Sequence, residues 1–147
     1  MNYDFDTFVP RRGTDCMKWD SSADGVLPLW VADMDFRAAP AIVDALRAYL
    51  HDNYLALLAF VCDLMPALQV ARLEATYLAW VDATHLGVPS TELACRLENE
   101  AKVKFSPGAI YGEEKGASVL RVNLACPRAT LLEALERTAG FLVNLRK

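Results

Sequence analysis

The stretch S-V-L-R-V-N-L-A-C-P-R, residues 118–128, decides how the main strand of the chain is built. Side chains along a strand alternate between its two faces. One face of this stretch is apolar throughout and predicts contact with a core: Leu120, Val122, Leu124 and Cys126. The other face is mixed and carries a charge in its middle: Val119, Arg121, Asn123 and Ala125. The pattern therefore predicts a strand with one buried face and one face that has another use.

Arg121 is the residue on that second face that requires an explanation. A guanidinium and an amide two residues apart, Arg121 and Asn123, suit a carboxylate that is gripped by paired N–H donors. The alternative is a structural ion pair between Arg121 and a nearby Asp or Glu, which is the commoner use of an arginine in a strand. The pattern by itself leaves both interpretations open and favours the ion pair.

The composition is that of one domain with an excess of apolar residues. The 147 residues are enough for one hydrophobic core. The hydrophobic fraction of 54% and the mean hydropathy of +0.15 are high for a soluble chain of this length. We therefore expect part of the surface to be covered by something else. The net charge of −4 and the scattered basic residues argue against a nucleic-acid partner.

Metal, membrane and export signals are missing from the sequence. The four cysteines lie far apart without C-x-x-C spacing, which predicts buried free thiols in a reducing compartment and no metal site. The acidic N-terminus lacks the apolar core of a signal peptide. The most apolar run, residues 55–62, is well short of the roughly 20 residues that a membrane span needs. The chain is expected to be cytoplasmic.

The first third of the chain predicts an irregular arm followed by one long helix. Residues 1–27 have no clean periodicity, and 27–36 read as a short extended segment that ends in two acids. Pro40 suits the first turn of a helix, and apolar residues recur at helical spacing until near Pro66. Such a helix of about 25 residues is roughly 38 Å long. Its second half is apolar nearly all round, which predicts burial on every side.

The remainder alternates between strands and helices. We predict strands at 69–73, 76–82, 102–105 and in the opening stretch, a loop at 112–116, and helices that begin at Ser90, as N-cap, and at Arg128. This order predicts an α/β protein of the α+β type, one domain over 1–147 with helices packed on three or four strands. Three aromatic residues in alternating apolar stretches are expected in the core: Trp30, Tyr77 and Trp80.

Several of these stretches together resemble one known family. F-D-T-F-V-P-R-R-G-T-D-C-M-K-W-D (5–20) and L-P-L-W-V-A-D-M-D-F (27–36) resemble the opening of the MalY/PatB family. Its members are pyridoxal-phosphate-dependent cystathionine β-lyases, C–S lyases of the class I/II aminotransferase superfamily. Three further stretches resemble the closing third of that family: L-E-A-T-Y-L-A-W-V-D (73–82), K-V-K-F-S-P-G-A-I-Y-G (102–112) and V-L-R-V-N-L-A-C-P-R (119–128).

The resemblance implies the small domain of a fold type I enzyme without its large domain. Residues 28–47 and 50–147 resemble the N- and C-terminal parts of that small domain, joined near 46–53. The family's large domain, with the lysine that holds pyridoxal phosphate as a Schiff base, has no counterpart here. No cofactor is therefore expected for this chain, although pyridoxal phosphate is the cofactor of the parent family.

The resemblance also reverses the interpretation of Arg121. It places Arg121 where the family's arginine grips the α-carboxylate of the substrate, with Asn123 as support. By the same analogy Val31, Ala32 and Asp33 border the substrate pocket, although Asp33 also fits a solvated loop or a helix cap. No catalytic residue is assigned, because none of the lysines matches the missing one. Only Lys18, beside Trp19, lies in an apolar context, and the resemblance gives it no cofactor role.

Three hypotheses of function follow. The first is an isolated carboxylate-binding small domain that is catalytically incompetent by itself and self-associates through an exposed apolar helix face, for example with Leu57, Phe60, Val61 and Leu64. The second is an interaction module that binds a partner chain or an apolar ligand through the same face. The third is an active lyase or aminotransferase whose large domain is supplied by another chain.

Overall fold

The computed structural model describes residues 4, 6–30 and 33–145. The chain gathers into two compact units, Met1–Leu46 and Arg47–Lys147, and the single domain over 1–147 stays a prediction. They are called the N-terminal unit and the C-terminal unit here, and each is described by itself. One long helix, α2 (Pro40–Leu64), begins at Pro40 and contains 25 residues, as predicted.

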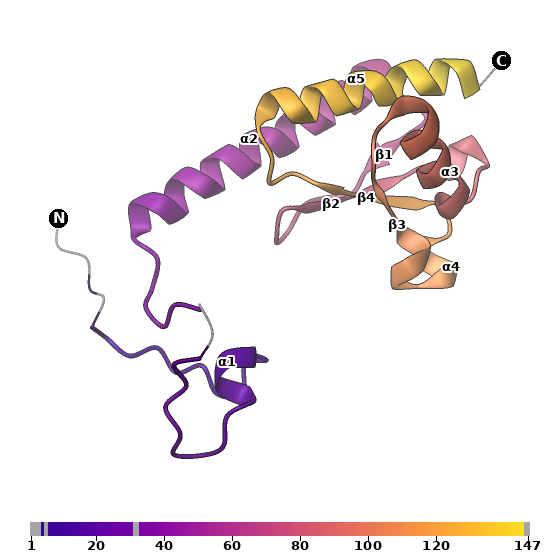
Figure 1. Ribbon diagram of the computed structural model, residues 1–147. Coiled ribbons are helices and arrows are strands. Elements are labelled where there is room, and N and C mark those ends of the chain that lie inside the picture. Colours follow the sequence, from indigo (N-terminus) through magenta and orange to yellow (C-terminus); the bar gives the residue numbers. More distant parts are fainter. Residues whose placement is uncertain (1–3, 5, 31–32, 146–147) are drawn as a thin grey trace. The chain divides into compact units, whose positions relative to one another are not determined.

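The C-terminal unit contains the sheet, a mixed helical and antiparallel arrangement of the predicted α+β type (Figure 1). Its four strands are β1 (Gln69–Val70), β2 (Leu78–Asp82), β3 (Ser106–Pro107) and β4 (Val119–Asn123), in the spatial order β1-β2-β4-β3. All three pairings are antiparallel. The main helices are the second half of α2, α3 (Ser90–Arg96) and α5 (Arg128–Leu145). Shorter turns are η1 (Thr84–Leu86), the π-helical η2 (Leu97–Ala101), η3 (Gly108–Tyr111) and α4 (Glu113–Gly116).

The apolar face of the opening stretch is buried as predicted. Leu120, Val122 and Leu124 are at most 3% exposed, and they join the buried residues of β2, α2, α3 and α5 in one core. Cys126 is half-buried and lies beyond the end of β4. Each fully buried leucine of this core contributes about 1.5–3 kcal/mol relative to an exposed one. The helices therefore cover one face of the sheet and leave the other to a different use.

Two residues of the predicted self-association face belong to this core. Leu57 and Val61 of α2 are 1% and 4% exposed, and they pack inside the C-terminal unit. Phe60 is partly buried against the same core, and Leu64 is exposed. The all-round apolar second half of α2 is thus explained in large part by its own chain. A surface for self-association has to use other residues.

Some local predictions fail, each for an identifiable reason. Ser90 is the first residue of α3 and not its N-cap, since its hydroxyl donates to the carbonyl of Gly116 (2.8 Å). Residues 102–105 form no strand, because Lys102 adopts a left-handed conformation (φ 58°) that ends η2. The β-pairing falls instead on β3, directly after the predicted strand.

The predicted burial of aromatic residues and cysteines also fails in part. Trp30, Tyr77 and Trp80 are 60%, 46% and 37% exposed, not core residues. All four cysteines are free thiols, yet Cys62 and Cys95 are exposed. In the described part of the chain no helix is both long and apolar enough to cross a membrane. The cytoplasmic location stays a prediction.

The N-terminal unit is more ordered than the irregular arm that the sequence predicted. A short helix, α1 (Met17–Asp20), is enclosed by loops that a single side chain holds together. The guanidinium of Arg12 donates to four backbone carbonyls, those of Trp19, Ser22, Ala23 and Val26, at 2.8–3.3 Å. It also lies over the indole ring of Trp19, 5.6 Å from its centroid. Polar contacts between a side chain and backbone carbonyls therefore hold the loops of the N-terminal unit together.

Candidate functional site

Arg121 lies half-buried in the middle of β4, on the face of the sheet that the helices leave open. Its direct cross-strand neighbours are Trp80 of β2 and Ser106 of β3. Its Nη2 donates a long hydrogen bond to Ser106 Oγ (3.4 Å). No described carboxylate lies within ion-pair distance of the guanidinium. The structural ion pair that the strand pattern favoured is thus not formed within residues 4, 6–30 and 33–145.

The guanidinium of Arg121 is held instead by an aromatic ring. Its Cζ lies over the ring of Tyr111, 4.4 Å from the centroid, which is a cation–π contact. Trp80 meets the same ring edge to face, with 5.6 Å between the centroids and an interplanar angle of 84°. Trp80, Tyr111 and Arg121 together form a cluster on the open face of the sheet, called the stacked cluster below.

Two grooves flank Trp80. The first has a volume of about 360 Å³ and includes Arg121, Arg72 and the apolar side chains of Leu73 and Leu78 in its lining. The second has a volume of about 470 Å³ and is lined by Tyr111, Val119 and the 108–116 segment. Both volumes fall within the range of small-molecule sites. The open face therefore offers an arginine, most of whose N–H donors bond to no described residue, beside space for a small ligand.

Asn123 shares a face with Arg121 but has a local structural use. Its Oδ1 accepts a hydrogen bond from the backbone N–H of Ala125 (2.8 Å), which shapes the turn after β4. The role of Asn123 as support for Arg121, which the resemblance implied, stays a prediction. A direct contact of Asn123 with a substrate stays a prediction.

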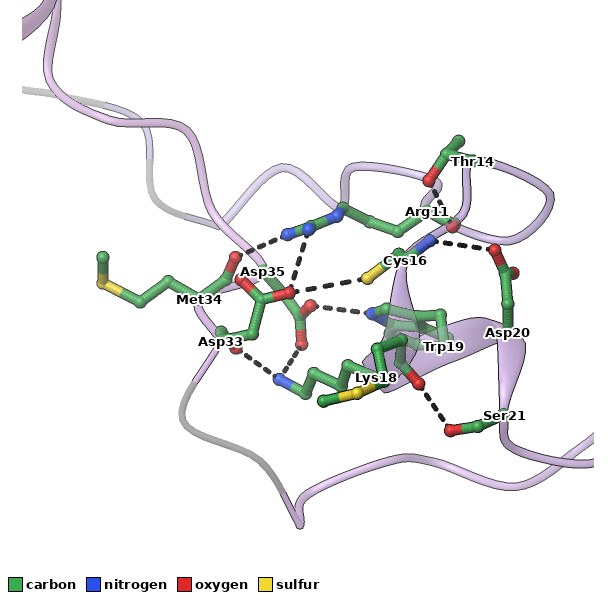
Figure 2. A network of polar contacts seen from close by, with 11 residues as sticks. Arg11, Thr14, Cys16, Lys18, Trp19, Asp20, Ser21, Asp33, Met34 and Asp35 are labelled. Atoms are coloured by element: carbon green, nitrogen blue, oxygen red, sulfur yellow. Dashed lines mark hydrogen bonds and ion pairs between the residues drawn. The ribbon is translucent and has the colours of Figure 1, made fainter. Parts of the chain in front are cut away.

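The other predicted pocket residues belong to the N-terminal unit. Val31 and Ala32 lie outside the described residues. The carboxylate of Asp33 is engaged by Arg11 Nη2 (2.9 Å) and lies 3.5 Å from the thiol of Cys16 (Figure 2). Its place at the border of a substrate pocket stays a prediction, and the contacts now give it a structural role as well.

Asp35 and Lys18 form the centre of the same network (Figure 2). Lys18 is only 6% exposed, and its ammonium donates to Asp35 Oδ2 (2.6 Å) and to the carbonyl of Asp33 (2.7 Å). The indole N–H of Trp19 donates to the other oxygen of Asp35 (2.7 Å). Lys18 and then Trp19 hold the pKa of Asp35 below its usual value, because both donate to the ionised form.

Comparison with known proteins places this arrangement in a class. No family model matches the chain. Cystathionine β-lyase PatB of Bacillus subtilis is 33% identical over 100 residues, which is 68% of this chain and 26% of PatB. The protein MalY of Escherichia coli is 44% identical over 50 residues, 31% of this chain and 13% of MalY. Among solved structures, cystalysin from Treponema denticola superposes with a TM-score of 0.68 at 26% identity, over 72% of this chain and 27% of cystalysin.

The fold and the open sheet face define part of a fold type I enzyme of the aminotransferase and C–S lyase class. Within that class the chain belongs by homology to the MalY/PatB family of cystathionine β-lyases. The chain spans about a quarter of the length of the PatB sequence that it matches. The pyridoxal phosphate that the cystalysin structure contains is a property of that protein.

The described lysines of this chain do not fit an aldehyde cofactor. A lysine that forms a Schiff base must present a free amine in a desolvated site. Lys18 is buried, but its ammonium is paired with Asp35 and also donates to the Asp33 carbonyl. Lys104 is exposed and paired with Glu98 (2.8 Å), and Lys102 and Lys115 are exposed. Nor does any group of His, Cys, Asp and Glu among the described residues form a metal site.

The stacked cluster was only partly visible in the sequence. Alternation identified Arg121, but nothing marked Tyr111, which stands ten residues earlier in a turn. Trp80 was noticed and assigned to the core. Its exposure depends on which face of the sheet the helices cover, and alternation alone does not tell this.

Proposed function

We propose that this chain is the substrate-carboxylate-binding small domain of a pyridoxal-phosphate-dependent C–S lyase or aminotransferase and does not catalyse the reaction by itself. One observation carries the proposal. Arg121 is half-buried on an open sheet face, beside a groove, with no carboxylate partner among the described residues. Since a guanidinium offers planar paired donors, such an arginine is suited to an incoming carboxylate.

The proposed absence of catalysis is supported by the described lysines. The described ones are either paired or exposed, so none meets the requirement of a desolvated free amine. The proposal therefore includes an internal loss of the large domain, with the join near 46–53 inside α2. An active enzyme would then need a large domain from another chain, which is the alternative form of this proposal.

An interaction module is a second candidate, favoured by the exposed apolar residues of the C-terminal unit. Tyr77, Trp80, Ile110 and Tyr111 are 37–63% exposed. Exposed apolar patches of this kind mark surfaces that bind a partner. Self-association through the exposed apolar surface remains part of the first proposal. Leu57 and Val61 do not belong to that surface, because they are buried.

Titration with sodium acetate tests carboxylate binding directly. The backbone amide resonances of β4 are followed in ¹⁵N spectra at constant ionic strength against chloride, since they are present in every variant. The Arg121 side-chain Nε–H resonance, identified by its loss in Arg121→Lys, is followed as well in the variants that keep Arg121. We expect a saturable shift that the Arg121→Lys variant abolishes and Arg137→Lys leaves intact. Arg137 is the matched control because it is exposed on α5 and paired with Glu133. Equal binding by wild type and Arg121→Lys would refute the proposal.

A further inference from the structure

The stacked cluster contains more than the arginine that the proposed function needs. The Cζ atom of the Arg121 guanidinium lies over the ring of Tyr111, 4.4 Å from the ring centroid. A guanidinium has five N–H donors, and a cation–π contact holds it through its charge and needs no hydrogen bond. Only Nη2 donates to a described residue, in the long bond to Ser106 Oγ. The stack thus restrains the guanidinium without using up its donors.

The position of Tyr111 is itself fixed by close backbone packing. Tyr111 ends η3, which begins at Gly108, and Gly108 packs directly against Gly116. A Cβ atom added at Gly116 would lie within hard contact of the Gly108 carbonyl group. Trp80 then supports the ring from the side through its edge-to-face contact. The ring is therefore held in place before any ligand arrives.

Trp80 also shapes the space beside Arg121. It lines the 360 Å³ groove together with Arg121, Leu73 and Leu78. The indole is 37% exposed, so an apolar group that packs on it removes apolar surface from water. If the carboxylate bound to Arg121 carries only a hydrogen atom or a methyl group, the indole surface of Trp80 stays in contact with water. A larger apolar group would cover it.

From this geometry we infer that Tyr111 is a positioning residue for Arg121, and that Trp80 makes the site selective for carboxylates that carry an apolar side group. The inference rests on the proposed function, since it needs Arg121 to bind carboxylate. It adds what that function leaves open, namely which carboxylates are preferred and which residues set the preference. Restraint of Arg121 before binding lowers the ordering cost that each carboxylate meets.

Acetate and phenylacetate are the two probes, with phenylacetamide as the neutral control. We expect phenylacetate to bind about fivefold more tightly than acetate, and phenylacetamide to cause no shift of the Arg121 Nε–H resonance. Trp80→Ala should reduce the ratio of phenylacetate affinity to acetate affinity to about twofold or less, in addition to any loss of acetate affinity caused by removing the support of the Tyr111 ring. Tyr111→Leu should weaken both carboxylates by about two- to fivefold, whereas Tyr111→Phe keeps the ring and binds like wild type.

The resonance of the Arg121 Nε–H group separates positioning from general stability. In free Tyr111→Leu it should lose its ring-current shift, while Tyr111→Phe should retain it. This inference would be overturned if Tyr111→Leu bound acetate as tightly as wild type, or if wild type bound acetate and phenylacetate equally well. In either case the proposed function would stand as long as acetate binding depends on Arg121. Absence of any Arg121-dependent carboxylate binding would overturn both.

Discussion

Asn53 provides the sharpest test of how the C-terminal unit is held together. Its side chain is 0% exposed and makes three hydrogen bonds. The amide nitrogen donates to the carbonyls of Leu124 (2.8 Å) and Cys126 (3.0 Å), and Oδ1 accepts from Arg128 Nε (2.6 Å). One residue of α2 thus ties the helix to the connection between β4 and α5. Asn53→Leu keeps the number and branching of the side-chain heavy atoms, adds volume through its two methyl groups and removes all three bonds.

The expected loss of stability follows from the groups left without partners. A buried carbonyl without a partner costs about 1–3 kcal/mol. Two carbonyls are affected, whereas Arg128 is half-buried and regains part of its hydration. We therefore expect Asn53→Leu to lower the free energy of unfolding by about 2–4 kcal/mol.

Equilibrium urea unfolding followed by far-ultraviolet circular dichroism measures this change, because α2 and α5 dominate the signal. The control is the same substitution at an exposed asparagine, Asn99→Leu, whose side chain contacts only the thiol of Cys95. It should change the free energy by no more than about 0.5 kcal/mol. A loss below about 1 kcal/mol in Asn53→Leu would refute the reasoning, because it would mean that the three bonds are replaced at no cost.

Three further predictions concern other parts of the chain. Gly116→Ala places a methyl group against the backbone of Gly108 and should lower the free energy of unfolding by about 3 kcal/mol. Gly140→Ala, in open space on α5, should raise the free energy of unfolding by about 0.5–1 kcal/mol. Thermal unfolding of both variants measures these changes, and equal changes would contradict the prediction. Because Lys18 holds the pKa of Asp35 low, the contribution of Asp35 is complete above the usual aspartate pKa and is lost as the pH falls through the lowered one. In nuclear magnetic resonance spectra, the resonances of the N-terminal unit should show a loss of structure in wild type as the pH falls, and Asp35→Asn should lack this pH-dependent change. The same change in both proteins over this pH range would contradict the prediction. Light scattering should show concentration-dependent self-association, and a clean monomer at high concentration would count against the exposed apolar surface.

The helices and the buried strand face were predictable because their signals are local. Pro40 marks the start of α2, and the apolar spacing continues until the helix ends at Leu64. Leu120 and Val122 alternate with Arg121 as a half-buried strand requires. Each of these signals depends on residues close together in the chain. No knowledge of the tertiary arrangement was needed.

The site was harder to predict because its parts are joined by long-range contacts. Alternation separates two strand faces but does not say which face lacks a cover, so Trp80 was assigned to the core. Tyr111 reaches Arg121 only because two glycines pack their backbones together, and such packing leaves no periodic signal. Arg12 binds four backbone carbonyls in the N-terminal unit. Because every residue has a backbone carbonyl, the sequence does not mark these four as its partners.

The central claim is that this chain carries the substrate-binding part of a C–S lyase without the part that holds the cofactor. Titration with pyridoxal phosphate, followed by borohydride trapping and mass-spectrometric mapping of the lysines, tests it most directly. The account predicts scattered adducts on exposed lysines such as Lys102 and Lys115, with no saturation. A saturable absorption band with a single modified lysine would contradict it and would make the chain a cofactor-binding protein in its own right.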